Sequence, residues 1–304
     1  MTRRVEKSKG NEFLRDTSIA IGFLLVGLVL SPVVTQWWIE DVANSPERLA
    51  KLLKNADIDG FSEVRKHVNT FVEFDGIDLS EKNMSGARLD SVTLNNANLS
   101  KTDLSYSKLD DIKVSGDLSE ARMINASLFR ADLSNSDLTN ADLTKANLTL
   151  SNLEKIYGFN SILENAVLWN TDLSHAYLEN ADMRDSFLGG ADLTNAYLRG
   201  ADLRDAYLRG ADLTNAYLED ADLRDAYLRG ADLTNADFRG ADLTNAYLGG
   251  ADFTNTDFDS AVLRNVTFYC ESLLDANLTN LNSMMNSFDI RLLNSSYQEV
   301  ESCH

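Results

Sequence analysis

Residues 191–200 read Ala191-Asp192-Leu193-Thr194-Asn195-Ala196-Tyr197-Leu198-Arg199-Gly200, which is one five-residue unit, Ala-Asp-Leu-X-X or a close variant, written twice. Across residues 128–278 every fifth residue is apolar at 30 of 31 positions, the exception being Gly158. Neither 3.6 nor 2 divides five, so one long helix would spread the leucines around its axis and one long strand would alternate them between its faces. The sequence therefore predicts a chain that turns a corner every five residues.

Each unit supplies an Ala and a Leu two residues apart, which point the same way in an extended segment. The last residue of the unit is Gly, Asn or Asp at twelve consecutive positions, and these types tolerate positive φ at the third position of a type II turn. The twelve residues are Asn195, Gly200, Asp205, Gly210, Asn215, Asp220, Asp225, Gly230, Asn235, Gly240, Asn245 and Gly250. The turn chemistry and the apolar pattern thus predict the same structure.

The tandem Ala-Asp/Asn-Leu-X-X motif resembles that of the pentapeptide-repeat family, over about two thirds of the chain from roughly Phe74 to Leu278. The resemblance implies an all-β fold, a right-handed quadrilateral β-helix with four units in each coil and with the Leu and Ala positions filling its interior. At a strand spacing of about 4.8 Å, about ten such coils would make a rod of roughly 50 Å.

The repeats begin in one phase and continue in another. Val114 ends the first phase, and the next central residue is Leu118, four positions on instead of five. We therefore expect a register slip with a local distortion at 115–118, inside a solenoid that spans 74–280. Past this solenoid the pattern weakens, so residues 281–304 are expected to form a C-terminal cap or tail.

Two further segments precede the solenoid. No charged residue occurs between Asp16 and Glu40, and 23 uncharged residues suffice to cross a bilayer as a helix. This predicts a basic N-terminal segment at 1–16 and a transmembrane helix at 17–39; a cleaved signal peptide is the alternative. Ser45-Pro46-Glu47 is typical of a helix start, so residues 40–73 are expected to form a helical linker that caps the solenoid, with a partner-binding helix as the alternative.

Basic residues set the expected orientation of the span. Five bases precede it and three follow closely: Arg3, Arg4, Lys7, Lys9 and Arg15, against Arg48, Lys51 and Lys54. The positive-inside rule then predicts a single-pass protein with a cytoplasmic N-terminus and an extracytoplasmic solenoid; a cytoplasmic solenoid is the alternative. Cys270 and Cys303 would lie in an oxidising compartment, where they either pair or remain two unrelated thiols.

The residue types argue against catalysis and against a nucleic-acid partner. Asp and Glu outnumber Lys and Arg by 47 to 28, and within 74–280 the counts are 34 and 17. Such a surface repels phosphates. The three histidines, His67, His175 and His304, show no metal-ligand spacing, and there is no nucleophile elbow or phosphate-binding glycine loop. We therefore expect no catalytic, metal or cofactor site.

If four units close a coil, residues twenty apart lie above one another and form outward rows. Two rows on opposite sides are aromatic: Tyr157, Tyr177, Tyr197 and Tyr217 on one, and Phe187, Tyr207, Tyr227 and Tyr247 on the other. Exposed rings suit the docking of a protein partner or a second copy, whereas stacking that only stabilises the sheet is the alternative reading. A third row is acidic: Asp172, Asp192, Asp212, Asp232 and Asp252.

Three functions remain open from the sequence. The first is a membrane-anchored, non-catalytic rod that serves as a protein-interaction scaffold. The second comes from the family resemblance, which implies that some members mimic DNA and protect topoisomerase from quinolones; the acidic row favours this and the predicted anchor opposes it. The third is a secreted effector, which requires that the anchor be cleaved or exported.

Overall fold

The computed structural model describes residues 46–57, 60–61, 72–269, 291–293 and 299–300. The chain divides into two compact units, Met1–Thr70 and Phe71–His304. The predicted span at 17–39 lies outside the described residues, as does most of the linker at 40–73, so both stay predictions. Within the described residues, no helix combines the length and the hydropathy needed to cross a membrane.

The first unit contains helix α4, Pro46–Lys54. Proline suits the first turn of a helix because the N–H that it lacks would have no intrahelical partner there. The helix ends in a Schellman motif: Ala56 has a φ of 53°, its N–H donates to Leu53 O, and the N–H of Asp57 donates to Leu52 O. Leu52 and Leu53 are both buried.

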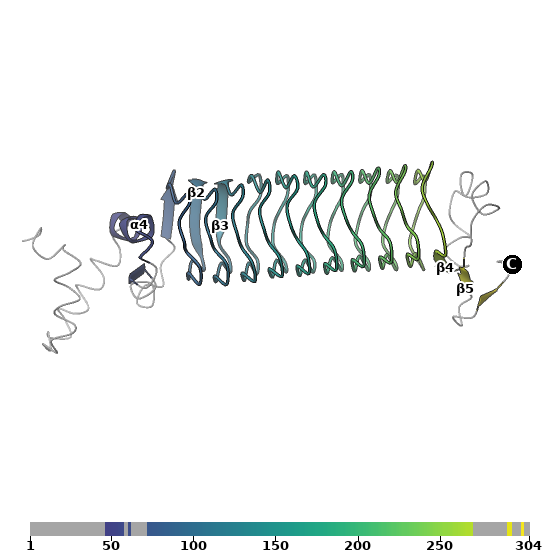
Figure 1. Ribbon diagram of the computed structural model, residues 1–304, viewed down its shortest axis with the longest axis horizontal. Helices are drawn as coiled ribbons and strands as arrows, with labels where there is room; N and C mark the ends of the chain where they lie inside the picture. The colour runs from purple at the N-terminus through teal and green to yellow at the C-terminus, as the bar shows by residue number, and fades with distance from the viewer. Residues whose placement is uncertain (1–45, 58–59, 62–71, 270–290, 294–298, 301–304) are drawn as a thin grey trace, which may run out of the picture. The chain divides into compact units, whose positions relative to one another are not determined.

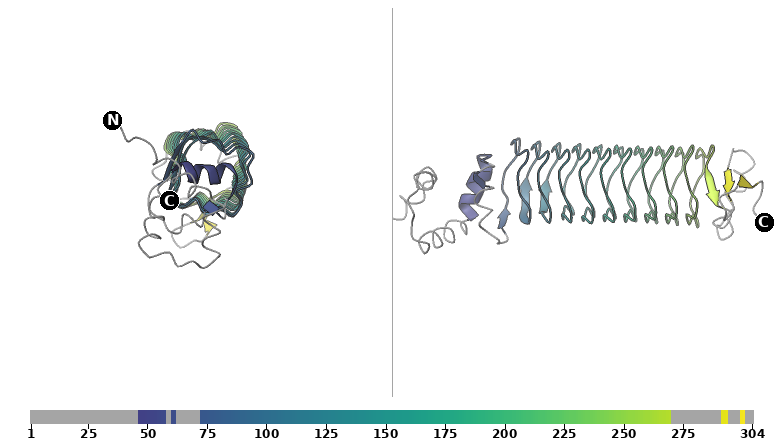
Figure 2. Two further views of the ribbon diagram at one scale, coloured as in Figure 1. Left: turned by 90° about the vertical axis from the view of Figure 1, so that its left-hand side faces the viewer. Right: turned by 90° about the horizontal axis from the view of Figure 1, so that it is seen from below.

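The second unit is a β-solenoid. Strands β1 (Val72–Asp75), β2 (Val92–Asn98) and β3 (Lys113–Asp117) form a parallel sheet. From there the ladder continues as parallel one-residue bridges between residues twenty apart, from Asp117–Asp137 to Tyr247–Thr267. Four five-residue units therefore close each coil, and the coils stack as Figure 1 shows, with a squared outline in the end-on view of Figure 2.

Strand β4 (Thr267–Tyr269) ends this regular stretch. It pairs in parallel with β5 (Arg291–Leu293), which pairs antiparallel with β6 (Glu299–Val300). Thr267 lies opposite Arg291, so the offset here is 24 residues instead of 20. Cys270 and Cys303 lie outside the described residues, and their pairing stays a prediction.

Backbone hydrogen bonds explain why a five-residue unit is stable. In the unit 192–196, three N–H groups donate to carbonyls of neighbouring coils and a fourth closes a β-turn. The bonds are Asp192 N to Thr171 O, Leu193 N to Asp212 O, Asn195 N to Thr214 O and Ala196 N to Leu193 O, at 2.7–3.0 Å. All twelve predicted turn residues have positive φ, between 57° and 75°, which confirms the turn chemistry.

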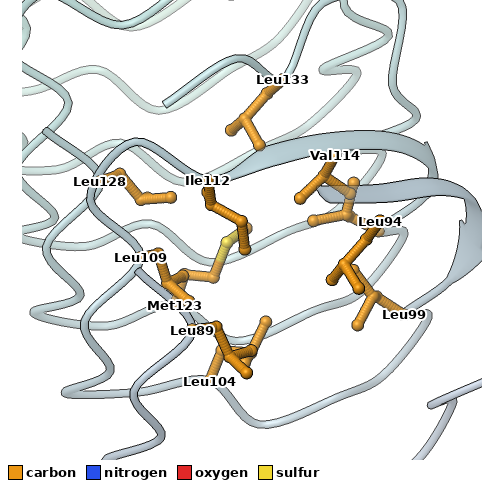
Figure 3. Close-up of a pocket in the computed structure, with 11 residues that line it drawn as sticks. Leu89, Leu94, Leu99, Leu104, Leu109, Ile112, Val114, Met123, Leu128 and Leu133 are labelled. Atoms are coloured by element: carbon orange, nitrogen blue, oxygen red, sulfur yellow. The ribbon is translucent and has the colours of Figure 1, made fainter. Parts of the chain in front are cut away.

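Alanine and leucine side chains fill the interior as predicted. From Leu118 to Phe268 the residues at the Leu position and at the Ala position of each unit are buried. Inside the solenoid the rings of Phe238 and Phe258 stack, with their centroids 5.4 Å apart. Gly158, which lacks a central side chain, leaves room that Leu178 Cδ2 occupies. Near the start of the solenoid a void of about 10 Å³ is lined by apolar side chains such as Leu104 and Met123 (Figure 3). That volume holds at most one water molecule and no substrate.

The change of phase is accommodated by a bulge between β2 and β3. Leu94 lies opposite Val114, twenty residues on, whereas Ala97 lies opposite Gly116, only nineteen on. Gly116 has a φ of 143°, and a Cβ built on it would lie 2.1 Å from the carbonyl oxygen of Ala97. Glycine is therefore required where the two backbones approach each other.

Candidate interaction faces

The candidate interaction residues form two stacked ladders on opposite faces of the solenoid. Each aromatic residue lies between two inward positions, an Ala or Ser and a Leu except at Tyr157, which lies between Ile156 and Gly158. Its ring therefore points outward, and parallel bridges set it above the equivalent residue of the next coil. The first aromatic ladder is Tyr157, Tyr177, Tyr197 and Tyr217, with centroids 4.8–5.2 Å apart. The second aromatic ladder is Phe187, Tyr207, Tyr227 and Tyr247, with centroids 4.7–5.1 Å apart.

The face that carries the second ladder is nearly flat. The Tyr207 and Tyr227 rings are inclined by 2° to each other, and so are those of Tyr227 and Tyr247. Neighbouring strands of an ordinary sheet rotate by roughly 20–25°. Rings that are stacked so nearly parallel keep their outer edges in line along the face, which suits contact with another extended surface.

The rings remain open to solvent on their outer edges. Tyr207, Tyr227 and Tyr247 are 37–41% exposed, and Tyr157 and Tyr217 are 40–47% exposed. Among the described residues, none donates to or accepts from a ladder phenol group. Each ladder thus offers apolar ring surface beside hydroxyl groups that are available to a partner.

Charged residues flank the second ladder on both edges. Two positions before the rings stand Asp185, Asp205 and Asp225; two positions after them stand Arg209 and Arg229. Burial raises the pKa of Asp205, and repulsion from Asp185 and Asp225 raises it further. Burial, the neighbouring rings, Asp205 and Asp225 raise the pKa of Tyr227.

The acidic row has a structural role that its composition does not reveal. In Asp172, Asp192, Asp212, Asp232 and Asp252, Oδ1 accepts the backbone N–H of the residue two positions on, at 2.9–3.0 Å. This N–H is the one that the ladder and the turn leave unused in each unit. One oxygen of each carboxylate in the row therefore serves the fold.

The fourth face has alternating charges that neutralise one another. Arg184 donates from Nε and Nη2 to the two carboxylate oxygens of Asp182, at 2.7 and 2.5 Å, and approaches Asp202 of the next coil at 3.7 Å. Arg204 and Arg224 repeat the arrangement. The hydrogen bond from Arg184 lowers the pKa of Asp182. This face therefore carries little net charge toward a partner.

Within the described part of the chain, no group of three His, Cys, Asp or Glu side chains could hold a metal ion. His175 is exposed in a turn position with a φ of 57°. His67 and His304 lie outside the described residues.

Two features of the faces were not predicted. The charged edges of the second ladder could have been read from the recurring Asp-Ala-Tyr-Leu-Arg sequence at 205–209 and 225–229, in which one unit ends and the next begins. The indole of Trp169, 42% exposed, lies directly over Gly189, where a Cβ would be 1.9 Å from the ring. That contact depends on residues twenty apart and becomes visible only when the coils are stacked.

Comparison with known proteins gives a family match. The sequence model of pentapeptide repeats matches this chain in eight copies, over residues 70–112, 117–154, 161–200, 201–240, 221–259 and 236–269. No curated protein sequence matches the chain.

Among solved structures, HetL of the cyanobacterium Nostoc sp. strain PCC 7120, a pentapeptide repeat protein involved in heterocyst differentiation regulation, is 31% identical. The match covers 67% of this chain and 95% of HetL, with a TM-score of 0.53. QnrB1, a plasmid-mediated fluoroquinolone resistance protein, is 20% identical over 64% of this chain and 83% of its own, with a TM-score of 0.30. A pentapeptide repeat protein of the Arabidopsis thaliana thylakoid lumen is 31% identical over 38% of this chain and 69% of its own, with a TM-score of 0.20.

Proposed function

The chain belongs to the pentapeptide-repeat family, and from this premise we propose that it is a non-catalytic rod that binds other proteins through its two aromatic ladders. The exposure of the stacked tyrosines on flat faces carries this proposal. Proteins of this family are generally non-catalytic. HetL, at 31% identity, is involved in regulating differentiation, a role that protein binding would serve.

Ring stacking within the solenoid does not by itself account for the ladders. Threonine and aspartate occupy the same rows at Thr267 and Asp237, and both residues form the same parallel bridges. An aromatic side chain is therefore not required for coil stacking. Its recurrence over four coils on each of two faces is better explained by contact with a partner, since aromatic rings are enriched at protein interfaces.

The test compares two triple variants of the full chain, captured from cells that express it and that are lysed in detergent. The ladder variant carries Tyr207→Thr, Tyr227→Thr and Tyr247→Thr; the control carries Asp192→Asn, Asp212→Asn and Asp232→Asn, which keeps each side-chain acceptor. Proteins that co-purify with wild type are quantified by mass spectrometry, and folding is checked by circular dichroism. We expect the ladder variant alone to lose specific partners at least tenfold. Equal recovery with both folded variants, or no specific partner with wild type, contradicts the proposal.

The rod is further proposed to be tethered to a membrane by residues 17–39. The proposal rests on the 23 uncharged residues between Asp16 and Glu40. Extraction of membranes at alkaline pH, with the mass of the protein measured in both fractions, tests it. A full-length chain in the pellet supports the tether, whereas a shortened soluble chain contradicts it and favours a cleaved signal peptide.

A second candidate function is mimicry of DNA toward a topoisomerase, and the acidic row favours it. Its outward carboxylate oxygens recur at every coil from Asp172 to Asp252, which resembles a row of phosphates. A gyrase supercoiling assay with and without a quinolone tests this candidate. Inhibition or drug protection that disappears with the triple Asp→Asn variant supports it, and unaffected supercoiling contradicts it.

A further inference from the structure

The face of the second aromatic ladder carries three parallel stripes over two successive coils. Asp205 and Asp225 form one edge, Tyr207 and Tyr227 the centre, and Arg209 and Arg229 the other edge. We call these six residues the striped face. Every one of them except Asp225 is exposed, and Asp225 is partly so.

The positions of the two edges follow from the geometry of the unit. Asp205 and Asp225 are the last residues of the units that precede Tyr207 and Tyr227, so they stand at the corner that the chain passes just before the rings. Arg209 and Arg229 each follow an inward leucine directly, which puts them at the next corner of the coil. Arg204 holds the equivalent position in the preceding unit and donates to Asp202. The corner position places Arg209 and Arg229 on the side of Tyr207 and Tyr227 away from the aspartates.

A face with one acidic and one basic edge is complementary to itself under a particular symmetry. A two-fold axis that runs parallel to the solenoid axis exchanges the two edges and leaves the height of each coil unchanged. Asp205 of one copy then faces Arg209 of the other, and Asp225 faces Arg229, while like rings meet at the centre. A two-fold axis perpendicular to the solenoid axis would instead set acidic edge against acidic edge.

We propose that two copies of this chain pair in parallel through the striped face, so that one class of partner for the rod is the chain itself. This inference rests on the proposed function and names a partner for the second ladder. Charge complementarity in matched register is the observation that carries it, since paired opposite charges select both the partner and its orientation.

Two other properties of this face favour close contact. From Tyr207 to Tyr247 successive rings are inclined by only 2°, so the ring edges of two such faces stay in line over these coils. Beside the basic edge stand Gly210 and Gly230, where a Cβ would have no neighbour within 4 Å, so no side chain holds the second backbone away. The opposing guanidinium would also relieve the repulsion that Asp205 receives from Asp185 and Asp225.

The first aromatic ladder lacks this pattern. The residues that precede its rings by two positions include Asn195 and Asn215, which carry no charge, and those that follow include Arg199 and Glu219, of opposite sign. A two-fold axis parallel to the rod therefore creates no matched ion pairs there. The pairing proposed here is specific to the second ladder.

The test uses charge reversal in the full chain, purified in detergent, with the protein mass measured by light scattering or native mass spectrometry. The acidic-edge variant carries Asp205→Arg and Asp225→Arg, and the basic-edge variant carries Arg209→Asp and Arg229→Asp. We expect wild type to be a dimer and each variant to dissociate at least tenfold more readily. Mixing the two variants is expected to restore dimers that contain one copy of each, because every edge then faces its opposite.

Orientation is tested by a cysteine cross-link. In a chain that carries Cys270→Ser and Cys303→Ser, Tyr247→Cys is expected to form a disulfide with its own equivalent, since parallel pairing sets equal heights together. A chain with Asp182→Asn and Asp202→Asn on a different face is the control for charge alteration and is expected to remain dimeric. Circular dichroism melting curves confirm that each variant is folded.

Each contrary outcome overturns the inference. Wild type that is monomeric at every concentration, folded edge variants that dimerise as well as wild type, or a mixture that does not recover dimers all contradict it. If monomeric wild type still loses captured proteins when the second ladder is replaced, the proposed function stands and the self-pairing is wrong. If neither dimers nor specific partners exist, both proposals are wrong.

Discussion

Oδ1 of Asp192 accepts the backbone N–H of Thr194 at 2.9 Å, which satisfies the one N–H group of the unit that neither the neighbouring coils nor the turn use. In another unit the side-chain oxygen of Asn147 accepts the backbone N–H of Thr149 in the same way, at 3.2 Å. Where a unit carries Asp or Asn at this position, the side-chain oxygen therefore serves the backbone, and the charge that accompanies Asp is a separate property. This distinction determines how the acidic row should respond to substitution.

Asp212→Asn should leave stability nearly unchanged, because the amide oxygen can still accept the N–H of Thr214. Asp212→Ala should lower stability by about 1 kcal/mol, because that N–H loses its protein partner. Chemical unfolding followed by circular dichroism measures both. Equal losses for the two variants would show that the charge, and not the acceptor, stabilises the unit.

Buried serines at the alanine positions fall into two kinds. The hydroxyl of Ser151 donates to Leu128 O at 2.7 Å, whereas the buried hydroxyl of Ser186 has no partner in the described structure. We expect Ser186→Ala to stabilise the solenoid by about 1 kcal/mol, and Ser151→Ala to be neutral or destabilising by a similar amount. Thermal unfolding of the two variants decides this, and a loss of stability in Ser186→Ala would contradict it.

Gly116→Ala should be severely destabilising, by about 3 kcal/mol or more, since its Cβ would overlap the backbone of Ala97. Gly210→Ala is the matched control. It also replaces a glycine of positive φ, at 66°, but nothing lies within 4 Å of the new Cβ, so only about 1 kcal/mol should be lost. Comparable unfolding midpoints for the two variants would rule out the close approach of β2 and β3.

The Asp182–Arg184 pair should make stability depend on pH. The hydrogen bond from Arg184 lowers the pKa of Asp182 below its ordinary value of 3.8. The pair therefore stabilises the fold fully at pH values above 3.8. This stabilisation is lost as the pH falls through the lowered pKa of Asp182 in the folded state. The stability difference between wild type and Arg184→Gln should therefore be constant near neutral pH and shrink below about pH 4. Urea unfolding at a series of pH values measures this difference. A difference that stays the same down to pH 2 would show that Asp182 gains nothing from Arg184.

Much of the fold could be predicted because the sequence repeats its information. The turn residue Asn195 recurs at Asn215 and Asn235, and the core residue Leu193 recurs at Leu213 and Leu233, so local turn preference and burial point to one structure. The slip at 115–118 was located from phase alone, but the need for Gly116 follows from the approach of Ala97, a residue nineteen positions earlier. Contacts of this kind depend on how two coils meet and are not encoded in either unit alone.

The candidate faces were predictable to a smaller extent. The stacking of Tyr207 on Tyr227 follows from a period of twenty, and the structure shows it. The backbone role of Asp192 and the two-edged character of the second ladder were not recognised, because both depend on where side chains next to the corners point. What the ladders bind stays a proposal.

The central claim is that the interior is a closed apolar stack and that only the outer faces are available for function. Thermal unfolding of two variants, with aspartate at adjacent positions, tests this claim most directly. Leu213 is fully buried and Thr214 is only partly so. We expect Leu213→Asp to unfold the coils around it, because it places an unpaired charge in the stack, and Thr214→Asp to shift the midpoint only slightly. Equal tolerance of both substitutions would contradict the inward position of leucine on which the fold, the ladders and the striped face all depend.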